Sequence, residues 1–119
     1  RLQSEMPERY SSFNQVPAIY CIELDLEGHH VLVGGSTKLT DNGEAIIAAY
    51  TVDKKFKQVA MILLDDASNR LVGRIIRLKG SNKFLAGTTN NIYIIELTSD
   101  NRLHKAGMIR AITSNGKLL

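Results

Sequence analysis

The sequence contains one cysteine, two prolines and no tryptophan among its 119 residues. Because Cys21 has no partner in the chain, no internal disulfide can form, and an intracellular location, cytoplasmic or nuclear, is expected. Few prolines and 44% apolar residues argue against wholesale disorder. The longest apolar stretches, such as residues 45–50, are far shorter than the roughly 20 residues of a transmembrane helix. We therefore expect one folded domain that does not enter a membrane.

The charge of the chain is mildly positive, at +3. Most cations alternate with apolar residues, as on solvated strand faces. The densest basic run is Lys54-Lys55-Phe56-Lys57, which could contact RNA by phosphate pairing and stacking. We interpret it instead as an exposed hairpin tip, with Phe56 in the core because it aligns with Leu103 in the repeat described below.

Short segments rich in Ile, Val, Thr and Tyr, separated by turn signals such as Asp41-Asn42-Gly43, predict β-strands rather than helices. The segments number eight, at 19–26, 31–35, 44–52, 59–64, 71–78, 83–88, 92–97 and 105–109. The predicted fold class is therefore all-β, with antiparallel strands.

The first four predicted strands recur as the second four. Gly28, Leu32 and Gly35 match Gly80, Phe84 and Gly87 at an offset of 52 residues. A second block, containing Ile47, Tyr50, Asp53, Phe56 and Met61, recurs at an offset of 47. The difference falls in the loop at 36–43, where a change in length costs little. The pattern predicts two four-stranded repeats.

Four strands per repeat is the blade of a β-propeller, and two segments resemble WD-repeat blades. Residues 109–119 resemble a blade opening, with an apolar strand, the turn Ser114-Asn115-Gly116-Lys117 and a following leucine. Residues 84–97 are similar to the middle of a blade. The Trp-Asp dipeptide is missing, since Tyr50-Thr51 and Glu96-Leu97 occupy its two places.

This resemblance implies four segments. Residues 1–17 are expected to be a polar leader or linker, 18–70 and 71–108 two blades, and 109–119 the start of a further blade. Because a propeller closes with about four or more blades, we expect an incomplete ring, completed by more of the same polypeptide or by other polypeptides.

Possible catalytic or metal-binding residues are few. The histidines (His29, His30 and His104) do not have a compact zinc-ligand spacing with Cys21, and we expect them to be exposed turn residues. Asp65-Asp66 is interpreted as a solvated loop rather than a calcium or acid–base site. Gly34-Gly35, with no helix after it, is expected to serve packing rather than phosphate binding. The sequence predicts no metal, cofactor or catalytic residue.

We therefore expect a non-catalytic protein-interaction scaffold, part of a WD-like propeller, whose partners are other proteins, including further blades or subunits. The predicted partner-binding residues lie in the 36–43 loop and are Thr37, Lys38, Asp41 and Asn42. Two alternatives remain open. One is a nucleic-acid-binding propeller, and the other is part of a propeller enzyme whose active site lies mostly outside this chain.

Overall fold

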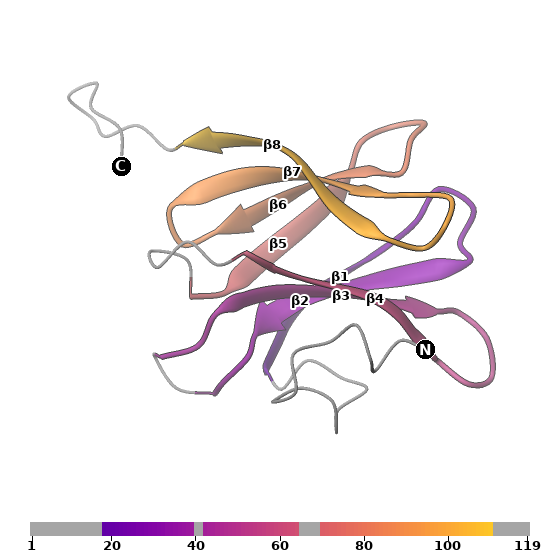
Figure 1. Cartoon of the computed structure of the whole chain (residues 1–119), viewed down its shortest axis with the longest axis horizontal. Helices are drawn as coiled ribbons and strands as arrows, with labels where there is room; N and C mark the ends of the chain where they lie inside the picture. The colour runs from indigo at the N-terminus through magenta and orange to yellow at the C-terminus, as the bar shows by residue number, and fades with distance from the viewer. Residues whose placement is uncertain (1–17, 40–41, 65–69, 111–119) are drawn as a thin grey trace.

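The computed structural model describes residues 18–39, 42–64 and 70–110, and within these ranges the chain is all-β, as predicted. Two four-stranded antiparallel sheets follow the chain order, β1-β2-β3-β4 and β5-β6-β7-β8 (Figure 1). The strands of the first sheet are β1 (Ala18–Leu24), β2 (His30–Ser36), β3 (Ala45–Thr51) and β4 (Gln58–Leu64). Those of the second are β5 (Val72–Arg77), β6 (Lys83–Thr88), β7 (Asn91–Leu97) and β8 (Leu103–Arg110).

The strand boundaries lie close to those predicted, and two differences occur at β1 and β8. β1 ends at Leu24 rather than Leu26, because Asp25 begins a turn in which its N–H donates to the His30 carbonyl. β8 runs from Leu103 to Arg110, so it begins two residues before and ends one residue after the predicted strand. Residues 1–17 and 111–119 lie outside the described residues.

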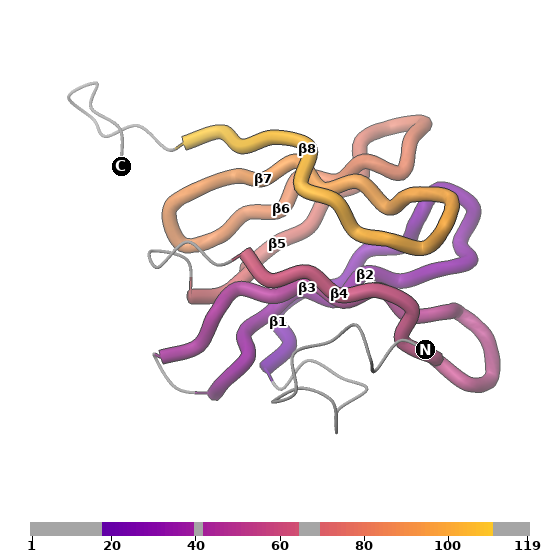
Figure 2. Tube along the Cα trace, viewed as in Figure 1, coloured from indigo at the N-terminus to yellow at the C-terminus, as the bar shows by residue number. Residues whose placement is uncertain are grey.

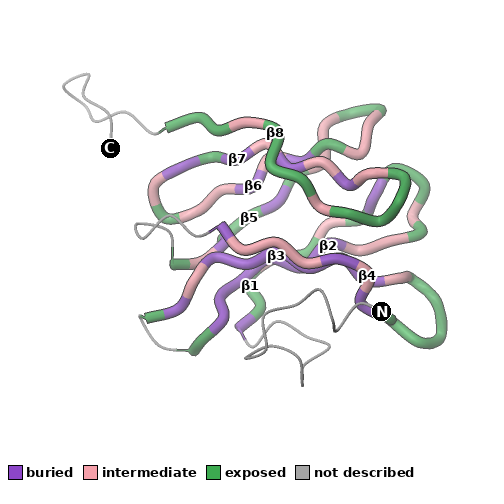
Figure 3. Tube along the Cα trace, viewed as in Figure 1, coloured by how far each residue is buried: buried purple, intermediate pink, exposed green. Residues whose placement is uncertain are grey.

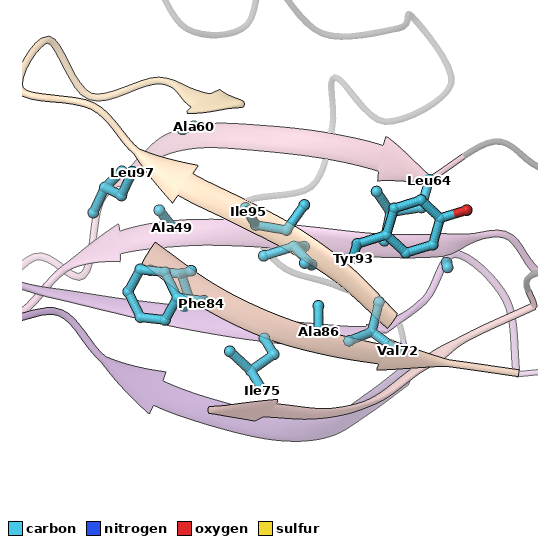
Figure 4. Close-up of a cluster of buried hydrophobic side chains, with 13 residues drawn as sticks. Ala49, Ala60, Leu64, Val72, Ile75, Phe84, Ala86, Tyr93, Ile95 and Leu97 are labelled. Atoms are coloured by element: carbon cyan, nitrogen blue, oxygen red, sulfur yellow. The ribbon is translucent and has the colours of Figure 1, made fainter. Parts of the chain in front are cut away.

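The two sheets form two layers, seen edge-on in Figures 1 and 2. We call the face that each sheet turns toward the other its inner face. The inner faces bury one core, which includes Leu32, Ile47 and Leu64 of the first sheet and Phe84, Tyr93 and Ile95 of the second. Figure 4 shows this cluster between the sheets, and Figure 3 shows that buried residues line the space between the layers whereas β8 is largely exposed. Each such side chain contributes about 1.5–3 kcal/mol by leaving water.

The layers approach most closely at the first strand of each sheet. β5 lies along β1 and reaches over β2, whereas the outermost strands, β4 and β8, touch at fewer points. Gly34 in β2 makes this approach possible, because an added Cβ would lie 2.8 Å from Val72 Cγ1 and 2.9 Å from Ile75 Cδ1. The layers therefore form a wedge that is tight at β1 and β5 and more open at β4 and β8.

The repeat is visible in the turns that follow the third strand of each sheet. Thr51 Oγ1 donates to the Asp53 carboxylate in the first turn, and Thr98 Oγ1 donates to Asp100 in the second. Each residue of the second pair lies 47 residues after its counterpart in the first pair, which is the predicted offset.

The predicted offset of 52 holds for the turn glycines Gly28 and Gly80, which both have a φ of 74°, but the pairing of the second strands with the third strands gives an offset of 51. Leu32 pairs with Ala49, and the equivalent of Ala49 at offset 47 is Glu96, which pairs with Lys83. Leu32 therefore corresponds to Lys83, an offset of 51. An error of one residue matters because neighbouring residues of a strand point to opposite faces of the sheet.

With the observed offsets, the two sheets stack with their equivalent faces pointing in the same direction. Ile46, Ala48 and Tyr50 lie on the outer face of the first sheet, in a second, smaller apolar cluster. Their equivalents at offset 47, Tyr93, Ile95 and Leu97, lie on the inner face of the second sheet. Each face of one repeat thus has its counterpart on the same side of the next, as in a stack of layers rather than a sandwich with two-fold symmetry.

Candidate functional site

The loop between β2 and β3 contains the predicted partner-binding residues, and the structure separates them. Thr37 is buried and holds the base of the loop. Its N–H donates to the Glu44 carbonyl at 3.0 Å, and its Oγ1 accepts from the Glu44 N–H at 2.9 Å. Thr37 is therefore not a surface residue.

Lys38 and Asn42 are exposed, whereas Asp41 lies outside the described residues. Beside Lys38, the side chain of Leu39 is 83% exposed, the highest value among the exposed large hydrophobic residues. Leu39 was not among the predicted contact residues, although a leucine isolated in a polar loop is a visible signal. The surface of this loop thus combines a cation, an amide and an apolar side chain.

The hairpin tip between β3 and β4 is exposed, but Phe56 is not a core residue as predicted. Its side chain is 57% exposed and its backbone adopts a φ of 44°. The first turn closes from Thr51 N–H to the Lys57 carbonyl, and the second from Thr98 N–H to Arg102. The first turn is therefore two residues longer, and Phe56 lies in the extra length.

The hairpin between β1 and β2 holds an aspartate–histidine pair. The buried carboxylate of Asp25 lies 2.9 Å from Nδ1 of His30 and accepts the N–H of His29 at 2.8 Å. Burial alone would raise the pKa of Asp25, but the hydrogen bonds from His30 and His29 outweigh it and hold the pKa below its usual value. His29 is exposed as predicted, whereas His30 is half-buried and bound to Asp25, which corrects the prediction that it is an exposed turn residue.

Polar contacts connect the two sheets near this hairpin. The Leu26 N–H donates to Asn82 Oδ1 at 2.6 Å, and the Arg77 N–H donates to Glu23 Oε1 at 3.1 Å. Since Asn82 follows β5 and Glu23 is in β1, these bonds join the first hairpins of the two sheets. The pair of sheets is thereby fixed at one end as well as through the core.

Metal-ligating side chains do not converge in the part of the chain that the structure describes. No group of three or more His, Cys, Asp or Glu side chains there could hold a metal ion. Cys21 faces the core, and burial raises the pKa of its thiol. Asp65-Asp66 lies outside the described residues. Among the described residues, no helix is long and apolar enough to cross a membrane.

Comparison with known proteins gave no match, either to a protein-family model or to a curated protein. The functional interpretation therefore depends on the geometry of the chain itself.

Proposed function

We propose that the chain is a non-catalytic protein-interaction scaffold made of two blades of a WD-like β-propeller. The observation that carries the proposal is the stacking of two repeat-related sheets in the same sense, tight at their first strands and open at their last. Blades that radiate from a common axis stack in this way. A rigid pair of sheets then presents its loops at the ends of the strands, where partner recognition needs no catalytic group.

The loop between β2 and β3 is the proposed contact surface for a partner protein, through Lys38, Leu39 and Asn42. Thr37, Ser36 and Gly43 form its base. Ser36 Oγ accepts the Lys38 N–H, and a Cβ on Gly43 would overlap Ser36 Oγ. The loop surface can therefore be changed while its base is kept.

Replacement of residues 38–42 by Gly and Ser residues of equal number is expected to weaken partner binding at least tenfold without unfolding the chain. Partners captured on the immobilised wild-type protein are identified by mass spectrometry, and the affinity of each purified partner is measured for both variants. Circular dichroism and urea unfolding show whether the variant is folded. Equal affinities for a folded variant would contradict the proposal.

A second candidate function, nucleic-acid binding, is favoured by one observation. Phe56, expected in the core, is instead exposed between the exposed lysines Lys55 and Lys57. An aromatic ring flanked by cations can stack on a base while the cations neutralise phosphates.

Neutralising Lys54, Lys55 and Lys57 would then weaken binding of a single-stranded RNA and reduce its dependence on salt. Fluorescence anisotropy over a salt series measures both effects. The matched control neutralises three exposed cations elsewhere, Lys79, Lys83 and Arg110. Equal losses in the two triple variants would indicate only nonspecific charge attraction.

A further inference from the structure

The outer face of the second sheet carries an apolar surface to which each of its four strands contributes. Ile76, Ile92 and Ile109 are 46%, 40% and 51% exposed, and Leu85 and Ile94 are half-buried. Strand pairing places them on one face, since Ile76 pairs with Leu85 and Leu85 with Ile94, while Ile92 pairs with Ile109. We call these five residues the outer apolar patch. Contiguous exposed apolar surface of this kind marks an interaction site.

Open space lies over Gly87 on the same face. Gly87 pairs with Arg74 on one side and with Ile92 on the other. The nearest neighbour of an added Cβ there is the Arg74 carbonyl oxygen, 4.0 Å away, whereas a Cβ at Gly107 would lie 3.3 Å from Ile94 Cδ1. A partner side chain can therefore enter the patch at Gly87, beside Arg74.

The charged residues that share this face are mostly cationic. Arg74 and Lys83 are exposed and lie at opposite ends of the patch along the strands. Lys83 pairs with Glu96, which is half-buried and pairs with the exposed His104. Two permanent cations thus share the face with one carboxylate. A partner with acidic groups on both sides of its apolar contact would complement these charges.

A further sheet stacked in the way that the second sheet packs on the first does not fit this patch. Leu85 pairs with Ile94 as Gly34 pairs with Ile47 in the first sheet. A Cβ at Gly34 would lie 2.9 Å from Ile75 Cδ1, so a leucine at the equivalent place prevents the same close approach. An α-helix needs no such approach, because it meets a sheet with an apolar stripe of side chains at i, i+3, i+4 and i+7.

We infer that the outer apolar patch binds an amphipathic α-helix of a partner protein, with Asp or Glu residues on both sides of its apolar stripe. The inference rests on the proposed function, since it gives the scaffold a second partner-binding surface besides the 38–42 loop. Four strands at about 4.8 Å spacing span about 14 Å, which about three turns of helix cover. The stripe buries the patch, and the carboxylates meet Arg74 and Lys83.

A synthetic peptide held helical by a side-chain crosslink tests the inference. The probe has about 14 residues, with leucines at i, i+3, i+4 and i+7 and glutamates on both sides of them. The matched peptide has lysines in place of the glutamates. Fluorescence anisotropy is expected to give a Kd of about 0.1 mM or tighter for the acidic peptide and at least tenfold weaker binding of the basic one. No binding of the acidic peptide, or equal binding of both, overturns the inference.

Methyl NMR locates the bound peptide on the chain. The δ1 methyl signals of Ile76, Ile92 and Ile109 are expected to shift on titration, whereas that of Ile47, which is buried between the sheets, stays in place. Shifts that leave the patch unchanged overturn the inference. Shifts of the patch signals with protein concentration alone would assign the patch to a second copy of the chain, and would overturn it as well.

Two matched pairs of variants test the apolar and the charged contacts. Ile76→Asp is expected to weaken peptide binding at least tenfold, whereas Ile22→Asp, at a 66% exposed isoleucine of the first sheet, leaves it unchanged. Arg74→Gln is expected to weaken binding and reduce its salt dependence, unlike Arg102→Gln at an exposed arginine in the turn after β7. Circular dichroism shows whether each variant is folded. Equal losses within either pair overturn the inference.

A membrane surface is the rival occupant, because an apolar patch with cations around it also suits anionic lipids. Cosedimentation with phosphatidylcholine vesicles, with and without phosphatidylserine, distinguishes the two. The wild type is expected to stay in the supernatant with both. Sedimentation with the phosphatidylserine vesicles that Ile76→Asp abolishes would assign the patch to a membrane and overturn the inference.

The 38–42 loop variant separates this inference from the proposed function. With its loop replaced by Gly and Ser residues, the chain is expected to bind the acidic peptide as the wild type does. Loss of a captured partner in that variant, with no peptide binding by the wild type, would refute the helix site alone. Peptide binding together with unchanged partner affinities in that variant would refute the loop's role alone.

Discussion

At the scale of single residues, close packing leaves no room for a side chain at some glycines, whereas at others a Cβ would meet no close neighbour. A Cβ at Gly35 would overlap the carbonyl oxygen of Ala18 on the neighbouring strand, where neither backbone can move without breaking the β1–β2 ladder. At Gly87, the nearest neighbour of such a Cβ is the Arg74 carbonyl oxygen, 4.0 Å away.

Gly35→Ala is therefore expected to reduce the free energy of unfolding by about 2 kcal/mol or more, since it overpacks the sheet. Gly87→Ala is the matched control and is expected to change it by less than about 1 kcal/mol, with a stabilising contribution from the lower entropy of the unfolded chain. Urea unfolding measures both. Similar losses in the two variants would contradict the packing account of Gly35.

Individual residues were predictable where the backbone pattern alone decides their place. The packing role of Gly34-Gly35 is confirmed by the contacts that a Cβ would make there. Thr37 was predicted to face a partner, whereas its hydroxyl accepts the Glu44 N–H and closes the loop. A polar residue in a loop is as able to satisfy the backbone as to face a partner, and sequence alone does not distinguish the two.

At the scale of elements, the β1–β2 hairpin depends on the charge of one carboxylate. Asp25 is buried and accepts hydrogen bonds from the backbone of His29 and from the His30 ring. Because its pKa is lowered in the folded state, its stabilising contribution is present above the pKa of the unfolded chain and is lost as the pH falls through the folded value.

Asp25→Asn is accordingly expected to reduce the free energy of unfolding by about 1–2 kcal/mol near neutral pH. The difference from the wild type should shrink as the pH falls below about 4, where the unfolded wild-type carboxyl is itself protonated. Urea unfolding at a series of pH values measures it. A difference that stays constant down to low pH would show that the carboxylate charge contributes nothing.

Strands were more predictable than the turns that join them. β6 spans the predicted residues, because its short apolar segment is bounded by turn residues on both sides. The strand pattern does not reveal the length of a turn. The two extra residues between Thr51 and Lys57 moved Phe56 from the predicted core to the surface.

At the scale of the whole molecule, the all-β class and the two four-stranded sheets were predictable, but the way they stack was not. The predicted offset of 52 for the second strands places Leu32 and Phe84 at equivalent positions. Both lie in the core between the sheets, so that equivalence would give the pair two-fold symmetry. The observed offset of 51 restores a stack of like layers, which only the pairing of strands reveals.

The central claim is that the inner face of the second sheet, with Val72 and Ile75, packs on the first sheet at Gly34. Nuclear Overhauser effects from selectively labelled methyl groups test it most directly. We predict strong effects between the Ile75 δ1 methyl and the Gly34 α protons, because a Cβ at Gly34 would lie 2.9 Å from that methyl carbon. Effects from Ile76 to Gly34, with none from Ile75, would reverse the second sheet and contradict the account.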